Sequence, residues 1–194
     1  EEKEKIKQQY TDGCEYFIFT GTIHPRKNLI NLLRAFSVFK KKQSSNMKLV
    51  ITGRMAWKTE EFTKLLNTFK FRNDVRLTGY VSKEELARLV ASAYAMVYPS
   101  FFEGFGVPPL EALQCHVPAI VSRNSAMPEV GADAYLYVNA ESFEDIAQKM
   151  MLLYKDETLR NKLVENGRER LTLFSWDKTA EKMWNCIELA AQAE

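Results

Sequence analysis

Two glutamates bracket a segment whose residue types could bind both a phosphate and a sugar. Between Glu103 and Glu111, the sequence FFEGFGVPPLE places two glycines and then two prolines. The prolines suit the first turn of a helix, where a missing N–H costs nothing, and a strand-like apolar run at residues 94–99 precedes them. We therefore predict that Glu103-Gly104-Phe105-Gly106 is a loop leading from a strand into a helix.

A loop of this kind has a defined binding chemistry. Uncapped backbone N–H groups at the start of a helix attract anions, and glycines let a ligand approach the backbone closely. Carboxylates repel a phosphate, so Glu103 and Glu111 are better placed to accept hydrogen bonds from sugar hydroxyls beside it. A nucleotide-sugar meets both demands. Each glutamate also has a plainer interpretation, as a surface carboxylate.

A second candidate segment, GTIHPRKN at residues 21–28, places Arg26 and Lys27 at the start of a predicted helix. Cations at this position oppose the helix dipole by roughly a few tenths of a kcal/mol unless an anion lies between them and the helix. This favours a phosphate-binding role for Lys27, with Arg26 as a second candidate. Solvated surface charge is the alternative for both residues.

Other nucleotide and metal motifs are absent from the sequence. There is no Asp-x-Asp pair and no clustered set of His, Cys and carboxylate ligands, so we predict no metal site, and cationic side chains with backbone N–H groups must neutralise a phosphate. The GxxxxGK[ST] loop is missing, and GxGxxG does not follow the first strand. NTPase and dehydrogenase functions are therefore disfavoured.

The elements that position these motifs follow from an alternation of apolar runs and helical patterns. Strands are predicted at residues 16–20, 49–52, 75–78, 95–98, 119–122 and 135–138, and helices between them at 28–42, 59–70, 83–93 and 108–115. This alternation predicts an α/β fold with a Rossmann-like, doubly wound parallel sheet. In such sheets ligands bind beyond the carboxyl ends of the strands, where both candidate loops lie.

Beyond residue 138 the pattern becomes helical. Helices are predicted at residues 143–155, 157–171 and 177–191. His116, at the end of the 108–115 helix, is interpreted as a left-handed end residue rather than a catalytic group. The last predicted helix carries more apolar side chains than a free tail needs, so we expect it to pack on this chain or on a neighbour.

Bulk properties limit the class of protein. At 194 residues with a net charge of +2, the chain suits one α/β domain and is too balanced for nucleic-acid binding. The three cysteines are scattered and odd in number, which argues against a disulfide framework and favours a reducing cytoplasm. No apolar run reaches the roughly 18 residues of a membrane span, and no signal peptide is visible.

Five segments together resemble retaining glycosyltransferases of family 4, specifically the C-terminal nucleotide-sugar-binding domain of their mannosyltransferase-like members. These segments are GTIHPRKN, VRLTGYVS, YPSFFEGFGVPPLEAL, NSAMPEVGADAYLYV and FSW. The resemblance implies a two-lobed GT-B architecture whose N-terminal lobe holds the acceptor. Residues 1–14 are then predicted to be a linker from that lobe, residues 15–174 the donor-binding domain, and residues 175–194 a closing C-terminal helix.

The resemblance also implies a role for each site residue. Glu103 would engage the donor sugar at the reaction centre, Glu111 the ribose hydroxyls, and Lys27 the diphosphate. Gly21 opens the phosphate-binding loop. Main-chain groups complete the implied site, at Gly104, Phe105 and Gly106 for the sugar and diphosphate and around Tyr80 and Val81 for the base. Many relatives carry Arg where this chain has Thr22, and Arg26 is the candidate to replace it.

The function implied is transfer of a hexose, with mannose as one candidate, from GDP- or UDP-sugar to a saccharide or lipid-linked acceptor. No metal and no other cofactor is expected, and this chain is expected to be inactive without the acceptor lobe. The implied location is the cytoplasm, with peripheral contact at the inner face of the membrane left open. Two alternatives stay open: another GT-B enzyme such as a sugar-nucleotide epimerase, and a non-catalytic nucleotide-sugar-binding module.

Overall fold

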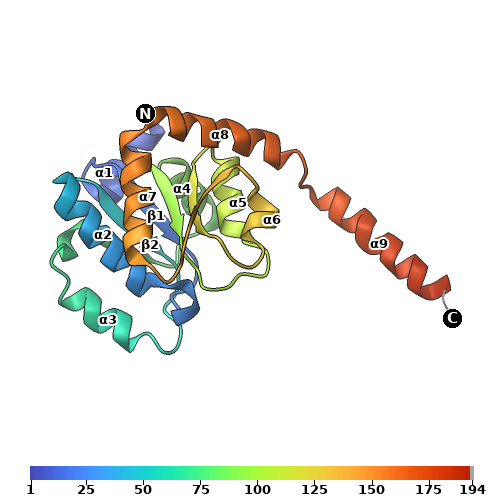
Figure 1. Ribbon diagram of the computed structural model, residues 1–194, viewed down its shortest axis with the longest axis horizontal. Helices are drawn as coiled ribbons and strands as arrows, with labels where there is room; N and C mark the ends of the chain where they lie inside the picture. The colour runs from blue at the N-terminus through green and yellow to red at the C-terminus, as the bar shows by residue number, and fades with distance from the viewer. Residues whose placement is uncertain (193–194) are drawn as a thin grey trace.

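The protein is described by a computed structural model over residues 1–192 (Figure 1). Its centre is a six-stranded sheet of order β3-β2-β1-β4-β5-β6, in which every neighbouring pair is parallel. The strands are β1 (Tyr16–Thr20), β2 (Lys48–Thr52), β3 (Val75–Gly79), β4 (Ala95–Tyr98), β5 (Ala119–Ser122) and β6 (Tyr135–Val138). The predicted doubly wound α/β sheet is confirmed, and each strand lies within one residue of its predicted bounds.

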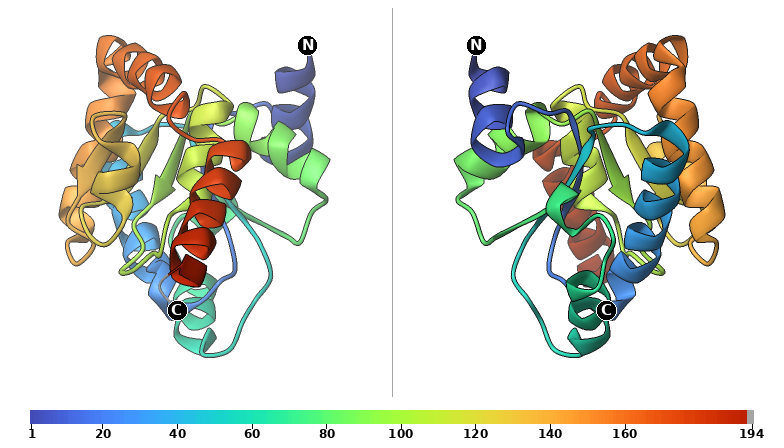
Figure 2. Two further views of the ribbon diagram at one scale, coloured as in Figure 1. Left: turned by 90° about the vertical axis from the view of Figure 1, so that its right-hand side faces the viewer. Right: turned by 90° about the vertical axis from the view of Figure 1, so that its left-hand side faces the viewer.

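Helices cover both faces of this sheet. They are α1 (Glu2–Thr11), α2 (Leu29–Gln43), α3 (Glu60–Asn67), α4 (Lys83–Ala91), α5 (Val107–Gln114), α6 (Met127–Gly131), α7 (Phe143–Lys155), α8 (Glu157–Leu171) and α9 (Trp176–Gln192), with 3₁₀ turns η1 (Pro25–Lys27) and η2 (Arg72–Asp74). Figure 2 shows α2 and α7 on one side of the sheet and α1 and α4 on the other. The helix α8 contacts both α5 and α7.

The strand order locates the edge at which a ligand should bind. All five residues of β1 are buried, as expected for a central parallel strand covered on both faces. From β1 the chain runs outward through β2 to β3, and from β4 it runs the other way through β5 to β6. The topological switch point therefore lies between β1 and β4, and the loops that follow these two strands carry the two candidate motifs.

The amino-terminal segment, predicted to be a linker, forms a helix. Residues 2–11 form α1, which packs against α4 and buries Ile6. The Tyr10 hydroxyl also donates to Glu85 Oε1 at 2.8 Å. The sequence EEKEKIKQQY hides this helix because it has only two large apolar side chains in ten residues, too few to show a helical period. The predicted division of the chain at residue 14 stays a prediction.

The carboxyl-terminal helix α9 extends away from the body of the protein (Figure 1). None of its residues is buried, although Trp176, Met183, Trp184, Ile187 and Leu189 are large apolar side chains. Ser175 caps its first turn, accepting a hydrogen bond from Lys178 N at 3.1 Å. The expected packing partner of α9 is therefore not the body of this chain, and residues 193 and 194 of the predicted closing helix lie outside the described residues.

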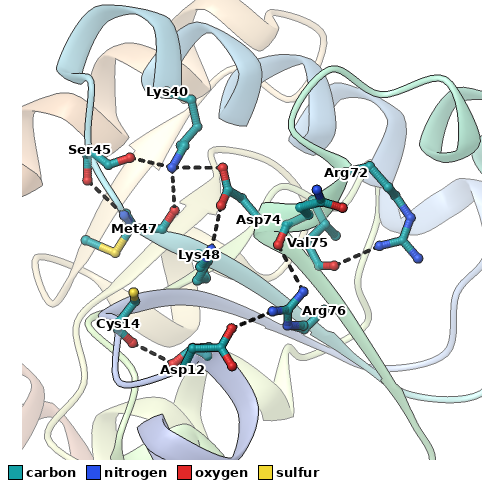
Figure 3. Close-up of polar contacts among 12 residues, drawn as sticks. Asp12, Cys14, Lys40, Ser45, Met47, Lys48, Arg72, Asp74, Val75 and Arg76 are labelled. Atoms are coloured by element: carbon teal, nitrogen blue, oxygen red, sulfur yellow. Dashed lines mark hydrogen bonds and ion pairs between the residues drawn. The ribbon is translucent and has the colours of Figure 1, made fainter.

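A partly buried ion cluster fixes the opposite, amino end of the sheet (Figure 3). Asp74, just before β3, accepts from Lys48 Nζ at 2.6 Å and lies 3.0 Å from Lys40 Nζ. Lys40 also donates to the carbonyl oxygens of Ser45 and Met47. These contacts join the end of α2 to β2 and β3. Burial alone would raise the pKa of Asp74, but the hydrogen bonds and charges of the two lysines lower it.

Candidate functional site

Three predicted site residues meet at the switch point, and Glu103 is at their centre. Its Oε1 atom lies 2.6 Å from Lys27 Nζ and 2.9 Å from Arg26 Nη1. The two loops are also joined through their backbones, because Phe101 N donates to Arg26 O at 2.9 Å. The Arg26 guanidinium donates to the carbonyl of Phe102 as well. The folded chain thus brings together residues that are 76 positions apart in sequence.

The members of this cluster differ in their exposure to water. The Lys27 and Glu103 side chains are each 10% exposed, whereas Arg26 is 41% exposed. Burial lowers the pKa of Lys27, although the hydrogen bond and charge of Glu103 act the other way. Burial would raise the pKa of Glu103, but the hydrogen bond and charge of Lys27, together with Ser100 and Arg26, lower it. Two cations share one carboxylate, so the cluster can accept a further anion.

Tyr98, the last residue of β4, completes the surroundings of Lys27 and was missed by sequence reasoning. Lys27 Nζ donates to the Tyr98 hydroxyl at 2.5 Å and lies 4.8 Å from its ring centroid. The Tyr98 ring stacks on Phe19, with ring centroids 5.4 Å apart. Burial, followed by the charge of Glu103, raises the pKa of Tyr98, so the hydroxyl stays neutral. The available signal was a hydroxyl at the carboxyl end of a buried strand beside the loop.

The loop at residues 104–106 leads into α5 as predicted. Gly106 precedes the helix with φ 88°, and a Cβ there would lie 2.0 Å from Met127 Cε, so only glycine fits without a shift. A Cβ on Gly104 would meet nothing within 4 Å, so this residue faces open space. The backbone N–H of Glu103 donates to Ser125 Oγ at 3.1 Å, which ties the loop to the segment after β5.

The second glutamate lies apart from this cluster. Glu111 is an exposed residue of α5, and among residues 1–192 no ion pair holds its carboxylate. Nearby protein atoms still withhold water from the carboxyl group, and this desolvation raises its pKa. Glu111 lines a cavity of about 390 Å³ between α5 and the start of α9, together with Phe105 and Trp176.

The predicted base-binding segment lies at the same edge of the sheet but two strands from β1. Tyr80 and Val81 follow β3, and the Tyr80 ring is exposed, with the Arg54 guanidinium carbon 4.3 Å from its centroid. The loops after β1 and β2 approach closely here, because a Cβ on Gly53 would lie 2.0 Å from Gly21 O. Gly21 is in turn beside Lys27, whose Cε would be 3.9 Å from a Cβ at that position.

The structure also bears on the predictions for a metal site, for the cysteines, for His116 and for membrane-spanning helices. Within residues 1–192, no three His, Cys, Asp or Glu side chains gather as metal ligands would, and the metal-free donor site stays a prediction. Cys14, Cys115 and Cys186 are free thiols. His116 has φ 57°, the left-handed conformation expected of it. No helix in the described part of the chain combines the length and apolar character needed to cross a membrane.

Comparison with known proteins identifies the class. The family described as glycosyl transferases group 1 matches residues 1–170. A relative, O-antigen chain mannosyltransferase B of Escherichia coli, is 32% identical over 174 residues, which cover 90% of this chain and 46% of that protein. The chain belongs to the glycosyl transferases group 1 family, and mannosyltransferases are among its homologues.

Solved structures agree on the fold. Sucrose-phosphate synthase from Thermosynechococcus elongatus superposes with a TM-score of 0.84 at 21% identity, over 98% of this chain and 49% of that one. Alr3699/HepE of Anabaena, in complex with UDP and glucose, gives a TM-score of 0.84 at 15% identity, over 96% and 52% of the two chains. The fold is that of the C-terminal lobe of GT-B glycosyltransferases, and the chain spans about half the length of these proteins.

Proposed function

We propose that this chain is the donor-binding half of a retaining glycosyltransferase of family 4. The complete protein transfers a hexose from an NDP-sugar, GDP- or UDP-linked, to a saccharide or lipid-linked acceptor. Mannose is the favoured hexose because the relative from Escherichia coli is a mannosyltransferase. The observation that carries the proposal is the meeting of Lys27, Arg26 and Glu103 at the switch point between β1 and β4.

Lys27 and Arg26 bind the diphosphate of the donor. Both cations now share Glu103 Oε1, and a phosphate oxygen offers each of them a more highly charged partner. The backbone N–H groups of Gly104, Phe105 and Gly106 contribute further donors at the start of α5. Arg26 thereby supplies the second cation that many relatives carry at the position of Thr22. Its contact with Glu103 beside Lys27 supports this replacement.

Glu103 orients the donor sugar while these cations stabilise the leaving group. In the transfer step the bond between the anomeric carbon and the β-phosphate oxygen breaks, and negative charge develops on that oxygen beside Lys27. The acceptor hydroxyl forms the new bond to the anomeric carbon from the same face, and its proton passes to the departing phosphate. The Tyr98 hydroxyl holds Lys27 in position for this role.

The rest of the donor lies along α5 and the loop after β3. Glu111 accepts hydrogen bonds from the ribose hydroxyls, and the main chain around Tyr80 and Val81 contacts the base. The exposed apolar side chains of α9 are buried against the lobe that holds the acceptor. The free cysteines fit a reducing cytoplasm, where the whole protein works alone or at the inner face of the membrane.

Calorimetry of this chain with GDP, UDP and ADP tests the proposal. We expect one of these nucleotides to bind, and we expect no hexose transfer, because the reaction needs a second lobe to close over the donor. Absence of binding by all three, with a folded state verified by circular dichroism, would remove the donor-site assignment. Transfer by this chain alone would contradict the division into two lobes.

A further inference from the structure

A second cavity, separate from the cluster around Glu103, lies between α3 and the start of α2. Its volume is about 250 Å³. Its apolar floor includes Ile23, Leu29 and Phe62, and its polar residues include His24, Lys58 and Glu61. Pockets for drug-sized ligands usually have volumes of roughly 300 to 1,000 Å³, so this one suits a smaller guest, about the size of one sugar ring.

Trp57 stands beside this cavity and is 71% exposed. It directly precedes Lys58, and its ring packs edge-on against His24 with centroids 5.3 Å apart and an interplanar angle of 77°. Both of these neighbours line the cavity. An indole that stays in water does not contribute the free energy that its burial would add to folding. Trp is also the side chain with the largest apolar face to offer a ligand. The exposed ring therefore has the properties of a binding platform.

The two loops that carry these rings are fastened to each other. Ile23 N donates to Arg54 O at 2.8 Å, and Ala56 N donates to Ile23 O at 3.0 Å. His24 Nδ1 accepts from the backbone N–H of Arg26 at 3.1 Å, so in the neutral imidazole the proton lies on Nε2, which is a donor. The cavity thus has an aromatic ring carried by a fastened loop, and a hydrogen-bond donor, beside its rim.

The charges around the cavity distinguish its guest from a phosphate. Lys58 and Glu61 have opposite charges that offset each other, whereas the Glu103 cluster has two cations for one carboxylate. A neutral ligand is therefore favoured. A pyranose ring matches this environment because its C–H groups can lie on the negative face of an indole while its hydroxyls meet the polar side chains.

We infer that this cavity and Trp57 form a saccharide subsite that holds one neutral hexose unit outside the donor site. The loops that carry it follow β1 and β2, so it opens at the same edge of the sheet as the donor site. Assigning that hexose to the acceptor rests on the proposed function; the subsite itself does not. It would hold a sugar of the acceptor away from the reacting hydroxyl.

Saturation-transfer NMR and tryptophan fluorescence with methyl α-D-mannopyranoside and a linear α-linked mannotriose test the subsite in this chain. We expect both sugars to perturb Trp57, with the trisaccharide binding at least as tightly as the monosaccharide. Trp57→Ala should weaken binding by roughly five- to tenfold, and Trp57→Phe should weaken it less because the aromatic face is retained. Trp184→Ala is the matched control, since Trp184 is also exposed, at 61%, but belongs to α9.

Each outcome separates this inference from the proposed function. Sugar binding that survives Lys27→Ala and saturating nucleotide, and that falls with Trp57→Ala alone, supports a separate subsite. No sugar response at high millimolar concentration, or an equal loss in the Trp57 and Trp184 variants, overturns it. Nucleotide binding without a sugar response would leave the proposed function standing, whereas sugar binding without nucleotide binding would refute only the donor site.

Discussion

The two ends of the sheet each carry a cluster in which two cations share one carboxylate, and the clusters differ in what surrounds them. At the amino end, Asp74 pairs with Lys40 and Lys48 between the end of α2 and β3. At the carboxyl end, Glu103 pairs with Lys27 and Arg26 between two loops at the switch point. The geometry of the ion pairs themselves is similar, with the shorter contact at 2.6 Å in both.

The difference lies in what else the cations contact. Lys40 also donates to two backbone carbonyls, so the Asp74 cluster joins three segments of the chain and is satisfied without a ligand. Lys27 instead contacts a side-chain hydroxyl, and Arg26, which also donates to the Phe102 carbonyl, is partly open to water beside a glycine loop. The presence of ion pairs alone therefore does not indicate a binding site. An ion cluster indicates one when it lies at the ligand-binding edge of the sheet and its cations stay accessible to a ligand.

The largest expected effect is on catalysis at the carboxyl-end cluster. Glu103→Gln should reduce kcat of the complete two-lobed enzyme about a hundredfold, because the contact of Glu103 with the sugar strengthens in the transition state. This corresponds to a rise of roughly 3 kcal/mol in the activation free energy. Affinity for NDP should change little. Steady-state kinetics with calorimetry on the same variant provide the check, and a normal kcat would end the reaction-centre role of Glu103.

The amino-end cluster should affect stability instead. Asp74→Ala leaves two partly buried lysines without their carboxylate and should lower the free energy of unfolding by about 2 to 3 kcal/mol, with NDP affinity unchanged. Because the folded-state pKa of Asp74 is lowered, its stabilisation is present above the ordinary value of 3.8 and is lost as pH falls through the folded-state pKa. Urea unfolding of both proteins from pH 7 to pH 3 should show the difference narrowing at the acid end. A difference independent of pH would contradict this role.

Glu111 should behave as a binding residue outside both clusters. Glu111→Gln replaces a charged hydrogen-bond acceptor and should weaken the binding of every nucleotide, with or without a sugar, by roughly 1 to 2 kcal/mol. Stability should stay within roughly 0.5 kcal/mol of wild type because the residue is exposed. A loss confined to sugar-bearing nucleotides would place Glu111 at the sugar and not at the ribose.

Tyr98→Phe gives the smallest effect and sharpens the contrast between the clusters. Removing the hydroxyl deletes one partner of Lys27 but leaves Glu103, so NDP affinity should fall by about 1 kcal/mol and nucleoside affinity should not change. The ring stacking on Phe19 is retained. An equal loss for nucleoside and NDP would assign Tyr98 to general packing of the strand rather than to positioning Lys27.

The sequence predicted those parts of the fold and site that depend on local pattern. Strands buried on both faces read as continuous apolar runs, and prolines followed by a helical period marked α5. The parts it missed depend on contacts distant in sequence: α1 packs against α4, and Tyr98 joins the candidate site only because Lys27 lies against it. Lys27 and Glu103 were each predicted as site residues, but their direct pairing emerges only when β1 and β4 are adjacent.

The most direct test compares Lys27→Ala with Lys40→Ala, since each removes a buried lysine that pairs with a carboxylate at 3.0 Å or less. Calorimetry with NDP and with the matching nucleoside should show that Lys27→Ala weakens NDP binding by about 2 kcal/mol, roughly thirtyfold, and weakens nucleoside binding far less. Lys40→Ala should leave both affinities unchanged while lowering stability. Equal losses for NDP and nucleoside in the Lys27 variant, or the same NDP loss in both variants, would contradict the claim that the carboxyl-end cluster binds the diphosphate.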